Sequence, residues 1–318
     1  IYKTFNKGTV NEKKALNGVS FTLNDGDFVT VIGGNGAGKS TTLNAVAGVW
    51  PVDSGSIIID GINVTGLPEH KRAKYLGRVF QDPMTSLNPT ITVGKQIGEV
   101  VRIHNKKMSR GQIRKRVIEL IQLVEIDRPE ERIRQYPHEF SGGMRQRAVM
   151  AIALAGNPKI LFADEPTTAL DVTIQAQILD VFRRIQKKLE MATVFISHDL
   201  GVVAGVADRV AVMYAGKIVE IGTAEEIFYD PRHPYTWGLL QSLPILAGEK
   251  EWLPTLPGMP PTLIHPPKGD AFAERNIYAM RIDYEKEPPM FRVTDTHYAA
   301  TWLLDERAPK MKVPTGGQ

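Results

Sequence analysis

The stretch FVTVIGGNGAGKS, residues 28–40, joins a short apolar run to a loop rich in glycine. The run Phe28–Ile32 has the length and composition of a buried β-strand. The loop after it matches the pattern Gly-x4-Gly-Lys-Ser, in which successive backbone N–H groups turn inward around a phosphate chain and a helix begins directly afterwards. A glycine-rich turn without a ligand is the alternative, but the strand before the loop and the helix-compatible residues after it favour phosphate binding. The stretch therefore predicts a nucleoside triphosphate site at the end of a strand.

Two side chains of this loop have predicted roles of their own. Lys39 would reach the β- and γ-phosphates, and the Ser40 hydroxyl would bind Mg²⁺. The other positions would supply backbone N–H groups or close packing around the phosphates. The predicted nucleotide-binding residues of this stretch are Gly33, Gly34, Asn35, Gly36, Ala37, Gly38, Lys39, Ser40 and Thr41. We expect ATP and Mg²⁺ to be the ligands.

A second strand pattern, Ile160–Ala163, ends in two adjacent carboxylates, Asp164 and Glu165. Neighbouring residues at a strand end point to different faces, so the two carboxylates can take separate roles. Asp164 is predicted to hold Mg²⁺ through its water shell, and Glu165 to orient and deprotonate the attacking water. An Asp-Glu pair alone is often only a solvated strand end, but downstream of a phosphate-binding loop it predicts a hydrolytic site.

Two further polar residues follow apolar runs. His198 comes after Thr193–Ser197, and Gln81 follows a two-residue apolar run. A lone histidine at a strand end is more often structural, and an isolated glutamine is usually a surface residue. Beside the two motifs above, we interpret His198 as a sensor of the γ-phosphate and Gln81 as a side chain that contacts both metal and water. The predicted catalytic residues are Glu165, His198 and Gln81, and the predicted metal-binding residues are Ser40, Gln81 and Asp164.

Apolar runs alternate with helical patterns over most of the chain. The runs predicted to be buried strands are Phe28–Ile32, Ile160–Ala163, Thr193–Ile196 and Val210–Tyr214. This alternation predicts an α/β fold with a parallel sheet, in which ligands bind at the carboxyl ends of the strands. Turn signals at Asp60-Gly61 and Ala215-Gly216 predict smaller antiparallel pieces beside the main sheet.

Composition divides the chain into regions. Residues 84–157 lack strong strand patterns and are predicted to form an inserted helical subdomain. After residue 225 the composition changes, because 13 of the 21 prolines fall in residues 231–318. Proline at that density excludes long helices and central strands, yet the region keeps many Trp, Tyr, Phe and Leu residues, unlike disordered segments. We predict a first domain over residues 1–225, including the helical insert, and an ordered but irregular proline-rich extension over residues 226–318.

Composition and charge limit the classes of function. The chain has 318 residues, of which 42% are hydrophobic and 23% charged, with a net charge of +4 and no cysteine. No apolar run approaches the roughly 20 residues needed to span a bilayer, so any membrane association is expected to come through partners. The lack of cysteine excludes a disulfide framework and a thiolate metal site. The chain begins at Ile1 rather than Met, so we expect a few residues to precede it.

Basic residues cluster at Arg110–Arg116, where apolar residues recur at helical spacing. We interpret this segment as an amphipathic helix with a solvated basic face. A nucleic-acid-binding surface would carry aromatic residues among the basic ones, and this segment has none. No nucleic-acid partner is expected.

In their order along the chain, the motifs resemble those of the nucleotide-binding subunits of ABC transporters. Besides the motifs above, the resemblance rests on FSGGMRQR (residues 140–147), which is similar to the signature sequence of that family, and on the turn ALD (residues 169–171). It covers residues 1–225 and implies a P-loop NTPase core with a small antiparallel β subdomain. The signature is the most specific element, because most other P-loop ATPases lack it.

The resemblance also implies a mechanism shared between two chains. Two nucleotide-binding domains meet head to tail, and each ATP lies between one P-loop and the signature of the partner. Ser141, Gly142 and Gly143 would then serve the partner's nucleotide, while Asp171 would communicate across the interface. Phe5 stands where such proteins stack an aromatic ring on adenine, and a core position is an equally good interpretation of this residue. The helical insert would receive the coupling helices of membrane subunits.

A narrower resemblance, over residues 80–318, is to the ATPases of oligopeptide/dipeptide importers. It rests on DPMTSLNP (82–89), PRHPYTW (231–237), PPKGD (266–270) and DTHY (295–298). It implies a second ATPase subunit, two transmembrane permease subunits and an external substrate-binding protein, with this chain peripheral at the cytoplasmic face of the cell membrane. Many such ATPases carry cysteines in the tail that suit an iron–sulfur cluster, and without cysteine no cluster is expected here. Residues 1–79 resemble another importer branch more closely.

The motifs leave open which kind of ATPase this is. The leading interpretation is an importer ATPase that energises peptide uptake. A soluble ABC ATPase that acts on ribosomes or DNA usually has two such domains in one chain or a long coiled-coil insert, and neither pattern occurs here. A regulatory module with a degenerate site is disfavoured because Lys39, Asp164, Glu165 and His198 are all present.

Overall fold

The computed structural model describes residues 1–168, 170–242, 256–264 and 266–310. The strands are β1 (Tyr2–Phe5), β2 (Lys13–Asn17), β3 (Phe28–Ile32), β4 (Ile58–Ile59), β5 (Ile62–Asn63), β6 (Leu76–Val79), β7 (Ile160–Asp164), β8 (Ala192–Ile196), β9 (Arg209–Tyr214), β10 (Lys217–Thr223), β11 (Phe291–Arg292) and β12 (Tyr298–Ala299). The helices are α1 (Lys39–Ala47), α2 (Glu69–Arg72), α3 (Pro83–Ser86), α4 (Val93–His104), α5 (Arg110–Leu123), α6 (Pro129–Arg132), α7 (Gly142–Leu154), α8 (Val172–Leu189), α9 (Leu200–Val206), α10 (Ala224–Tyr229), α11 (Pro234–Gln241) and α12 (Arg281–Glu285).

The main sheet is mixed, with the strand order β11-β12-β10-β9-β3-β8-β7-β6. The strands β9, β3, β8, β7 and β6 run parallel, as the alternation of strand and helix patterns predicted. At one edge β10, β12 and β11 add antiparallel pairs. Every residue of β3 and β8 is buried, so these two strands form the centre of the sheet.

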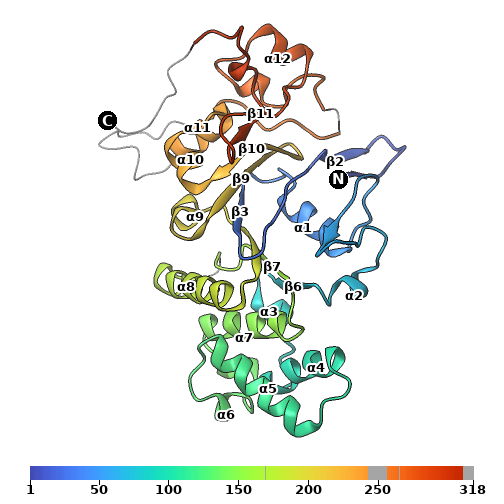
Figure 1. The fold of residues 1–318 in the computed structure, drawn as a ribbon, viewed down its shortest axis with the longest axis vertical. Coiled ribbons are helices and arrows are strands. Elements are labelled where there is room, and N and C mark those ends of the chain that lie inside the picture. Colours follow the sequence, from blue (N-terminus) through green and yellow to red (C-terminus); the bar gives the residue numbers. More distant parts are fainter. Residues whose placement is uncertain (169, 243–255, 265, 311–318) are drawn as a thin grey trace.

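Successive residues of β3 pack against different helices. Phe28 and Phe195 lie in one apolar cluster with Phe182 of α8, whereas Val29 and Leu43 of α1 belong to another. The two helices therefore cover opposite faces of the sheet, and Figure 1 shows them on either side of β3. Parallel strands that are buried on both faces have no solvated side, which explains why β3 and β8 are almost entirely apolar.

Both predicted hairpin turns form, but the second has a different place from the one expected. Each turn has positive φ at its two central residues, 52° and 73° at Asp60-Gly61 and 49° and 78° at Ala215-Gly216, a geometry that matches the twist of antiparallel strands. The first turn joins β4 and β5 in a small separate sheet. The second joins β9 to β10, and because β9 is already part of the main sheet, β10 extends it. The prediction of a separate antiparallel piece is wrong at this turn.

Residues 83–154 contain the helices α3 to α7 and no strand, and they lie at the lower end of the molecule in Figure 1. Helix α5 begins with a capping box made by Ser109 and Gln112, and its buried residues are Val117, Leu120 and Ile121. The basic residues of this helix lie on the other face, as its amphipathic pattern predicted.

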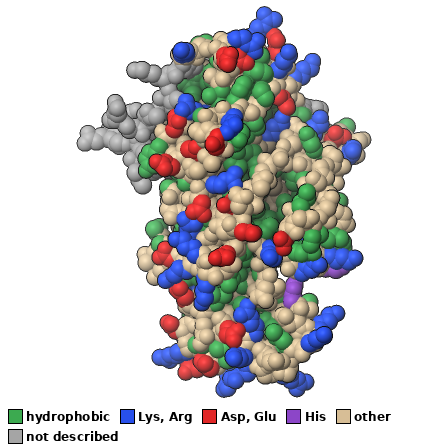
Figure 2. Space-filling model, in the orientation of Figure 1, with side chains coloured by type: hydrophobic (Ala, Val, Ile, Leu, Met, Phe, Trp, Pro, Cys, Tyr) green, Lys and Arg blue, Asp and Glu red, His purple; other side chains and the backbone are tan. Residues whose placement is uncertain are grey.

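Acidic and basic side chains are intermixed over the visible face of the molecule (Figure 2), in keeping with 39 basic and 35 acidic residues. Among the described residues, no helix has both the length and the apolar character of a membrane span.

The segment after β10 packs onto the main sheet and completes it. Its short helices and two-residue strands agree with its high proline content. Three of its aromatic residues are buried, with exposed fractions of 2% for Tyr235, 5% for Trp237 and 1% for Phe272. Because β12 pairs with β10, the sheet continues past residue 225.

A buried carboxylate attaches this segment to β10. Glu220 is completely buried and accepts hydrogen bonds from the backbone N–H groups of Arg232 and His233. The Nε2 atom of His297 lies 2.7 Å from its Oε1 atom. A buried carboxylate is costly unless it is hydrogen-bonded, so these partners, from two separate parts of the C-terminal segment, stabilise β10 and its neighbours together.

Candidate active site

The phosphate-binding loop predicted from the sequence connects the central strand β3 to α1. Its first residue, Gly33, has φ of 146°, and a Cβ atom there would lie 2.2 Å from the carbonyl oxygen of Met213 on β9. No side chain fits at that distance, so only glycine allows the loop to leave β3 in this direction. The first backbone N–H groups of α1 have no partner within the helix.

The amino group of Lys39 lies within this loop. Its Nζ atom donates hydrogen bonds to the carbonyl oxygens of Gly33 at 2.6 Å and Gly34 at 3.1 Å, and the residue is only 7% exposed. Burial lowers the pKa of this amine, and the negative charges of Glu165 and Asp164 act in the opposite direction. Among the described residues, the hydrogen-bond partners of this buried cation are neutral carbonyls, which favours the entry of an anion.

Asp164, the last residue of β7, faces the start of α1. Its Oδ1 atom accepts a hydrogen bond of 3.2 Å from the Ser40 hydroxyl. Burial raises the pKa of the Asp164 carboxyl, while the Ser40 hydrogen bond lowers it. Two oxygen ligands thus lie side by side at the edge of the loop.

The neighbouring carboxylate, Glu165, contacts a different set of side chains. Its Oε2 atom lies 3.3 Å from Nδ1 of His198, 3.2 Å from the hydroxyl of Thr168 and 3.5 Å from Nε2 of Gln81. Its backbone has φ of 47°, and its N–H donates to the carbonyl of Ile196 at 3.1 Å. Left-handed backbone at a residue other than glycine is strained and concentrates at functional sites. The structure therefore brings together the three predicted catalytic residues.

A pocket of about 190 Å³ connects these groups with the N-terminal strands. Its lining residues are Phe5, Lys13, Ala15, Asn35, Gly36, Ala37, Gly38, Lys39, Ser40, Thr41, Glu165 and Leu263. The ring of Phe5 packs edge-on against Trp50 at a centroid distance of 5.0 Å. Phe5 therefore has a packing partner and also lines the pocket, which is compatible with both interpretations of this residue.

The signature residues lie elsewhere in the chain. Ser141 caps the N-terminus of α7 by accepting from the N–H of Met144 at 3.3 Å. Gly142 and Gly143 follow it in the first turn of α7, which Figure 1 shows well below α1. Asp171 caps α8 by accepting from the N–H of Ile174 at 3.0 Å. None of these four residues lines the pocket beside the phosphate-binding loop, and Ala169 lies outside the described residues.

Several contacts of the site were not predicted. Thr168 bonds to Glu165, and Lys13 and Leu263 line the pocket. The hydroxyl of Tyr235 accepts a hydrogen bond of 2.8 Å from the N–H of Gly34. The sequence PRHPYTW, which contains Tyr235, stands out, but no sequence pattern connects it with a loop 201 residues earlier.

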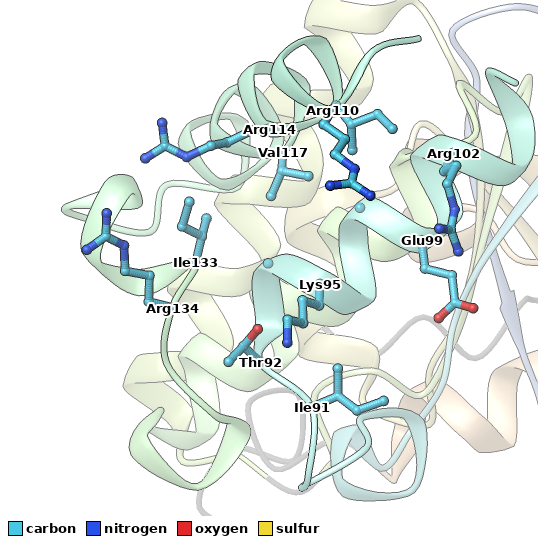
Figure 3. A pocket seen from close by; sticks show the side chains of 13 residues that line it. Ile91, Thr92, Lys95, Glu99, Arg102, Arg110, Arg114, Val117, Ile133 and Arg134 are labelled. Atoms are coloured by element: carbon cyan, nitrogen blue, oxygen red, sulfur yellow. The ribbon is translucent and has the colours of Figure 1, made fainter. Parts of the chain in front are cut away.

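A second hollow, of about 700 Å³, lies in the helical segment, lined by residues of α4, α5 and their flanking loops (Figure 3). Its apolar residues include Ile91, Ile113, Val117 and Ile133. Its charged residues are Lys95, Glu99, Arg102, Arg110, Arg114 and Arg134. The hollow is therefore lined by apolar residues and by mainly basic ones, which we call its rim, and none of the described residues that line it is aromatic. We call it the α4–α5 groove.

Comparison with known proteins gives family matches over two parts of the chain. Residues 16–168 match the family described as ABC transporter, and residues 219–282 match the one described as oligopeptide/dipeptide transporter, C-terminal region. The two matches together include every predicted site residue except Phe5 and those between the two matched regions, Asp171 and His198.

Two curated relatives align over almost the whole chain. It is 57% identical to the oligopeptide transport ATP-binding protein OppD of Bacillus subtilis, over 95% of this chain and 87% of the relative. It is 54% identical to the dipeptide transport ATP-binding protein DppD of Lactococcus lactis, over 94% of this chain and 88% of the relative. These alignments leave only about 5% of the chain outside, so they include most of residues 1–79.

Among solved structures, the chain is similar to the ATP-binding cassette MJ0796, described as a dimer in a post-hydrolysis state bound to ADP and Pi. The TM-score is 0.62 at 28% identity, over 70% of this chain and 96% of that one.

Proposed function

The chain belongs to the ATP-binding proteins of the oligopeptide/dipeptide ABC importer family, which couple ATP hydrolysis to transport, and on this premise we propose how its residues do so. It acts as one of two cassettes in a head-to-tail dimer that energises the uptake of peptides. The observation that carries the proposal is the convergence of Gln81, Thr168 and His198 on the carboxylate of Glu165, beside the buried Lys39.

ATP binds through the phosphate-binding loop. The backbone N–H groups of Gly36, Ala37 and Gly38, together with those of Lys39, Ser40 and Thr41 at the start of α1, hold the phosphates. The ammonium of Lys39 binds the β- and γ-phosphate oxygens, which provide the negative charge that its carbonyl partners lack. Gly33, Gly34 and Asn35 shape the loop around them. Phe5, which lines the same pocket, stacks against adenine.

The residues present fit a magnesium ion. The Ser40 hydroxyl and the Asp164 carboxylate are oxygen ligands of the kind that Mg²⁺ prefers, and they already lie 3.2 Å apart. The amide oxygen of Gln81, two residues after the end of β6, would supply a further ligand. When bound, the ion neutralises charge on the β- and γ-phosphates.

Hydrolysis depends on Glu165 as general base. Its carboxylate accepts a proton from the attacking water, and Gln81 orients that water. His198 contacts Glu165 at present and senses the γ-phosphate when nucleotide is bound. The left-handed backbone of Glu165 separates its carboxylate from that of Asp164, so the two acids serve different partners.

The second cassette completes the site. Ser141, Gly142 and Gly143 begin a helix whose first N–H groups are free to meet an anion, and they lie apart from this chain's own phosphate-binding loop. They therefore serve the nucleotide of the partner, and Asp171 lies at the same interface. The dimeric state of the similar solved cassette supports this arrangement.

Two transmembrane permease subunits bind to the helical segment, which recruits the chain to the cytoplasmic face of the cell membrane, and an external binding protein delivers the peptide. The α4–α5 groove forms part of the permease-facing surface, with its basic rim matching an acidic partner segment. Residues 226–318 form the extension typical of peptide importers, appended to a cassette of residues 1–225 whose helical insert spans about 84–157. With no cysteine, the chain holds no iron–sulfur cluster in this extension.

Affinity purification of the full chain from detergent-solubilised membranes of its own organism is expected to recover two polytopic permeases. Arg102→Glu combined with Arg114→Glu, on the rim of the α4–α5 groove, should lose both permeases and abolish uptake of labelled peptides, while ATP binding stays normal. Arg281→Glu is the matched control, because this arginine lies in α12 and its side chain is 92% exposed. Recovery of ribosomes or DNA in place of permeases would contradict the proposal.

DNA binding at the same groove distinguishes the proposal from its alternative, a soluble ABC ATPase that acts on DNA or ribosomes. Its rim has five basic residues but the groove has no aromatic lining, so bases have nothing to stack on. We expect only weak, sequence-independent DNA binding, which disappears as salt rises to about 200 mM because it depends on phosphate contacts alone. Fluorescence anisotropy with labelled duplexes measures this. A site-selective complex that persists at this salt concentration would favour the alternative.

A further inference from the structure

The C-terminal extension contacts the phosphate-binding loop directly, through the hydroxyl of Tyr235. The N–H of Gly34 donates a hydrogen bond of 2.8 Å to Tyr235 of α11. This donor belongs to the loop that holds phosphates, yet it points to the extension. The contact gives a role to the sequence PRHPYTW, which the catalytic proposal leaves without one.

The N–H of Gly34 belongs to the same peptide group whose carbonyl accepts from Lys39. The carbonyl of Gly33 and the N–H of Gly34 are the two ends of one planar peptide group. Lys39 donates to that carbonyl at 2.6 Å, while Tyr235 accepts from that N–H. Each bond polarises the peptide group and strengthens the other. The peptide group is thus held from both ends, by the phosphate-binding lysine and by the extension.

The hydrogen bonds also fix which way the peptide group faces. If it rotated, its carbonyl would leave Lys39 and its N–H would lose Tyr235. Gly33, with φ of 146°, has no side chain to oppose such a rotation, because glycine tolerates many backbone conformations. Tyr235 therefore restrains the rotation of this peptide group, which the glycines of the loop leave free.

Tyr235 is itself held firmly by its own segment. His233 caps α11 by accepting from the N–H of Tyr235 at 3.0 Å. Burial lowers the pKa of His233 to about 3, so its imidazole is neutral and its Nδ1 atom can accept. The indole N–H of Trp237 donates to the carbonyl of Pro231 at 2.8 Å, and Glu220 accepts from the N–H of His233. These hydrogen bonds hold residues 231–237, PRHPYTW, in one conformation and attach them to β10.

We propose that Tyr235 is a positioning residue through which the C-terminal extension preorganises the phosphate-binding loop for ATP. It keeps the Gly33–Gly34 peptide group in the orientation that holds the amino group of Lys39 inside the loop. This inference rests on the proposed function of Lys39. A loop that is already in its binding conformation loses less conformational freedom when ATP binds, so the effect falls on affinity rather than on the chemical step.

A neighbouring tyrosine offers a matched control. The rings of Tyr214 and Tyr235 lie 4.6 Å apart, and both residues are buried. The hydroxyl of Tyr214 accepts from Arg275 at 3.3 Å, and among the described residues no hydrogen bond joins it to the phosphate-binding loop. Tyr214→Phe therefore removes a buried hydroxyl from the same aromatic cluster but leaves the peptide group of Gly33 and Gly34 untouched.

The test compares wild type, Tyr235→Phe and Tyr214→Phe as full chains, by equilibrium binding of a fluorescent ATP analogue and by thermal unfolding. ATPase kinetics are measured in the assembled transporter. Tyr235→Phe is expected to weaken nucleotide binding roughly 3- to 10-fold, as the loss of one hydrogen bond would, and to raise KM by a similar factor. Its kcat at saturating ATP should stay within about twofold of wild type. Tyr214→Phe should keep wild-type affinity and KM.

Two kinds of outcome separate this inference from the proposed function. If wild type binds ATP and Tyr235→Phe binds it equally well, the positioning role is wrong while the ATPase assignment stands. The positioning role is also wrong if both variants lose affinity alike in proportion to lost thermal stability, because that is a structural effect of the cluster. If wild type itself fails to bind ATP, the proposed function is wrong and the inference fails with it.

Discussion

Glu165→Gln is expected to bind ATP normally and to hydrolyse it about 10²–10⁴ times more slowly, the usual cost of removing a general base. This corresponds to roughly 3–5 kcal/mol of activation free energy. The amide keeps the shape of the carboxylate and its hydrogen bonds to Thr168 and Gln81, but it cannot accept a proton from water. Loss of a negative charge beside the γ-phosphate can also tighten ATP binding, so the mutant transporter should accumulate in a closed, ATP-bound dimer.

Single-turnover hydrolysis in the assembled transporter, beside equilibrium binding of ATP, measures both parts of this expectation. Glu190→Gln is the matched control, since Glu190 also has left-handed backbone, with φ of 48°, but it caps the far end of α8. That variant should hydrolyse ATP at the wild-type rate. Turnover near the wild-type rate in Glu165→Gln would remove this residue as the base, or assign the activity to the site of the partner subunit.

Lys39→Ala is expected to lose ATP binding and hydrolysis together. Its ammonium is the buried cation of the loop, and it contacts phosphate oxygens both before and during the reaction, so neither step survives its removal. Lys39→Met, which keeps the length of the side chain without its charge, should lose both as well. This separates the loss of charge from the loss of packing.

Isothermal titration with Mg-ATP and steady-state hydrolysis check this expectation. Thermal unfolding without nucleotide shows whether each variant is folded, because a folded variant that does not bind ATP is the predicted result. Unchanged ATP affinity in a folded Lys39→Met would refute the role given to this lysine.

Local sequence patterns predicted the elements that depend on local physics. The buried strands Phe28–Ile32 and Ile160–Asp164 follow from continuous apolar runs, and the hairpin at Asp60-Gly61 follows from turn chemistry. The phosphate-binding loop is a local motif as well. Asp164 and Glu165 contact different groups, but Glu165 follows the end of β7 with left-handed backbone, so strand alternation alone does not account for their separation.

Elements that depend on distant partners could not be predicted in this way. The strand Tyr298–Ala299 is only two residues long, and its place in the main sheet comes from pairing with β10 rather than from its own composition. The contact between Gly34 and Tyr235 joins residues 201 positions apart. Ser141 lies apart from the phosphate-binding loop of its own chain, and it can contact a nucleotide only if a second chain is present. The sequence predicts that second chain only through the resemblance to a family.

The buried carboxylate of Glu220 sets an order for the synthesis of this protein. Glu220 lies on β10, but His297 follows it by 77 residues. At about 5–20 residues per second, a ribosome needs roughly 4–15 s to add this interval. Until then β10 is an open sheet edge, the kind of surface that pairs with other nascent chains, and the carboxylate lacks its histidine partner. The cassette therefore cannot complete its main sheet when residue 225, the last of the predicted first domain, has been made. A chain that ended there would keep the edge of β10 exposed.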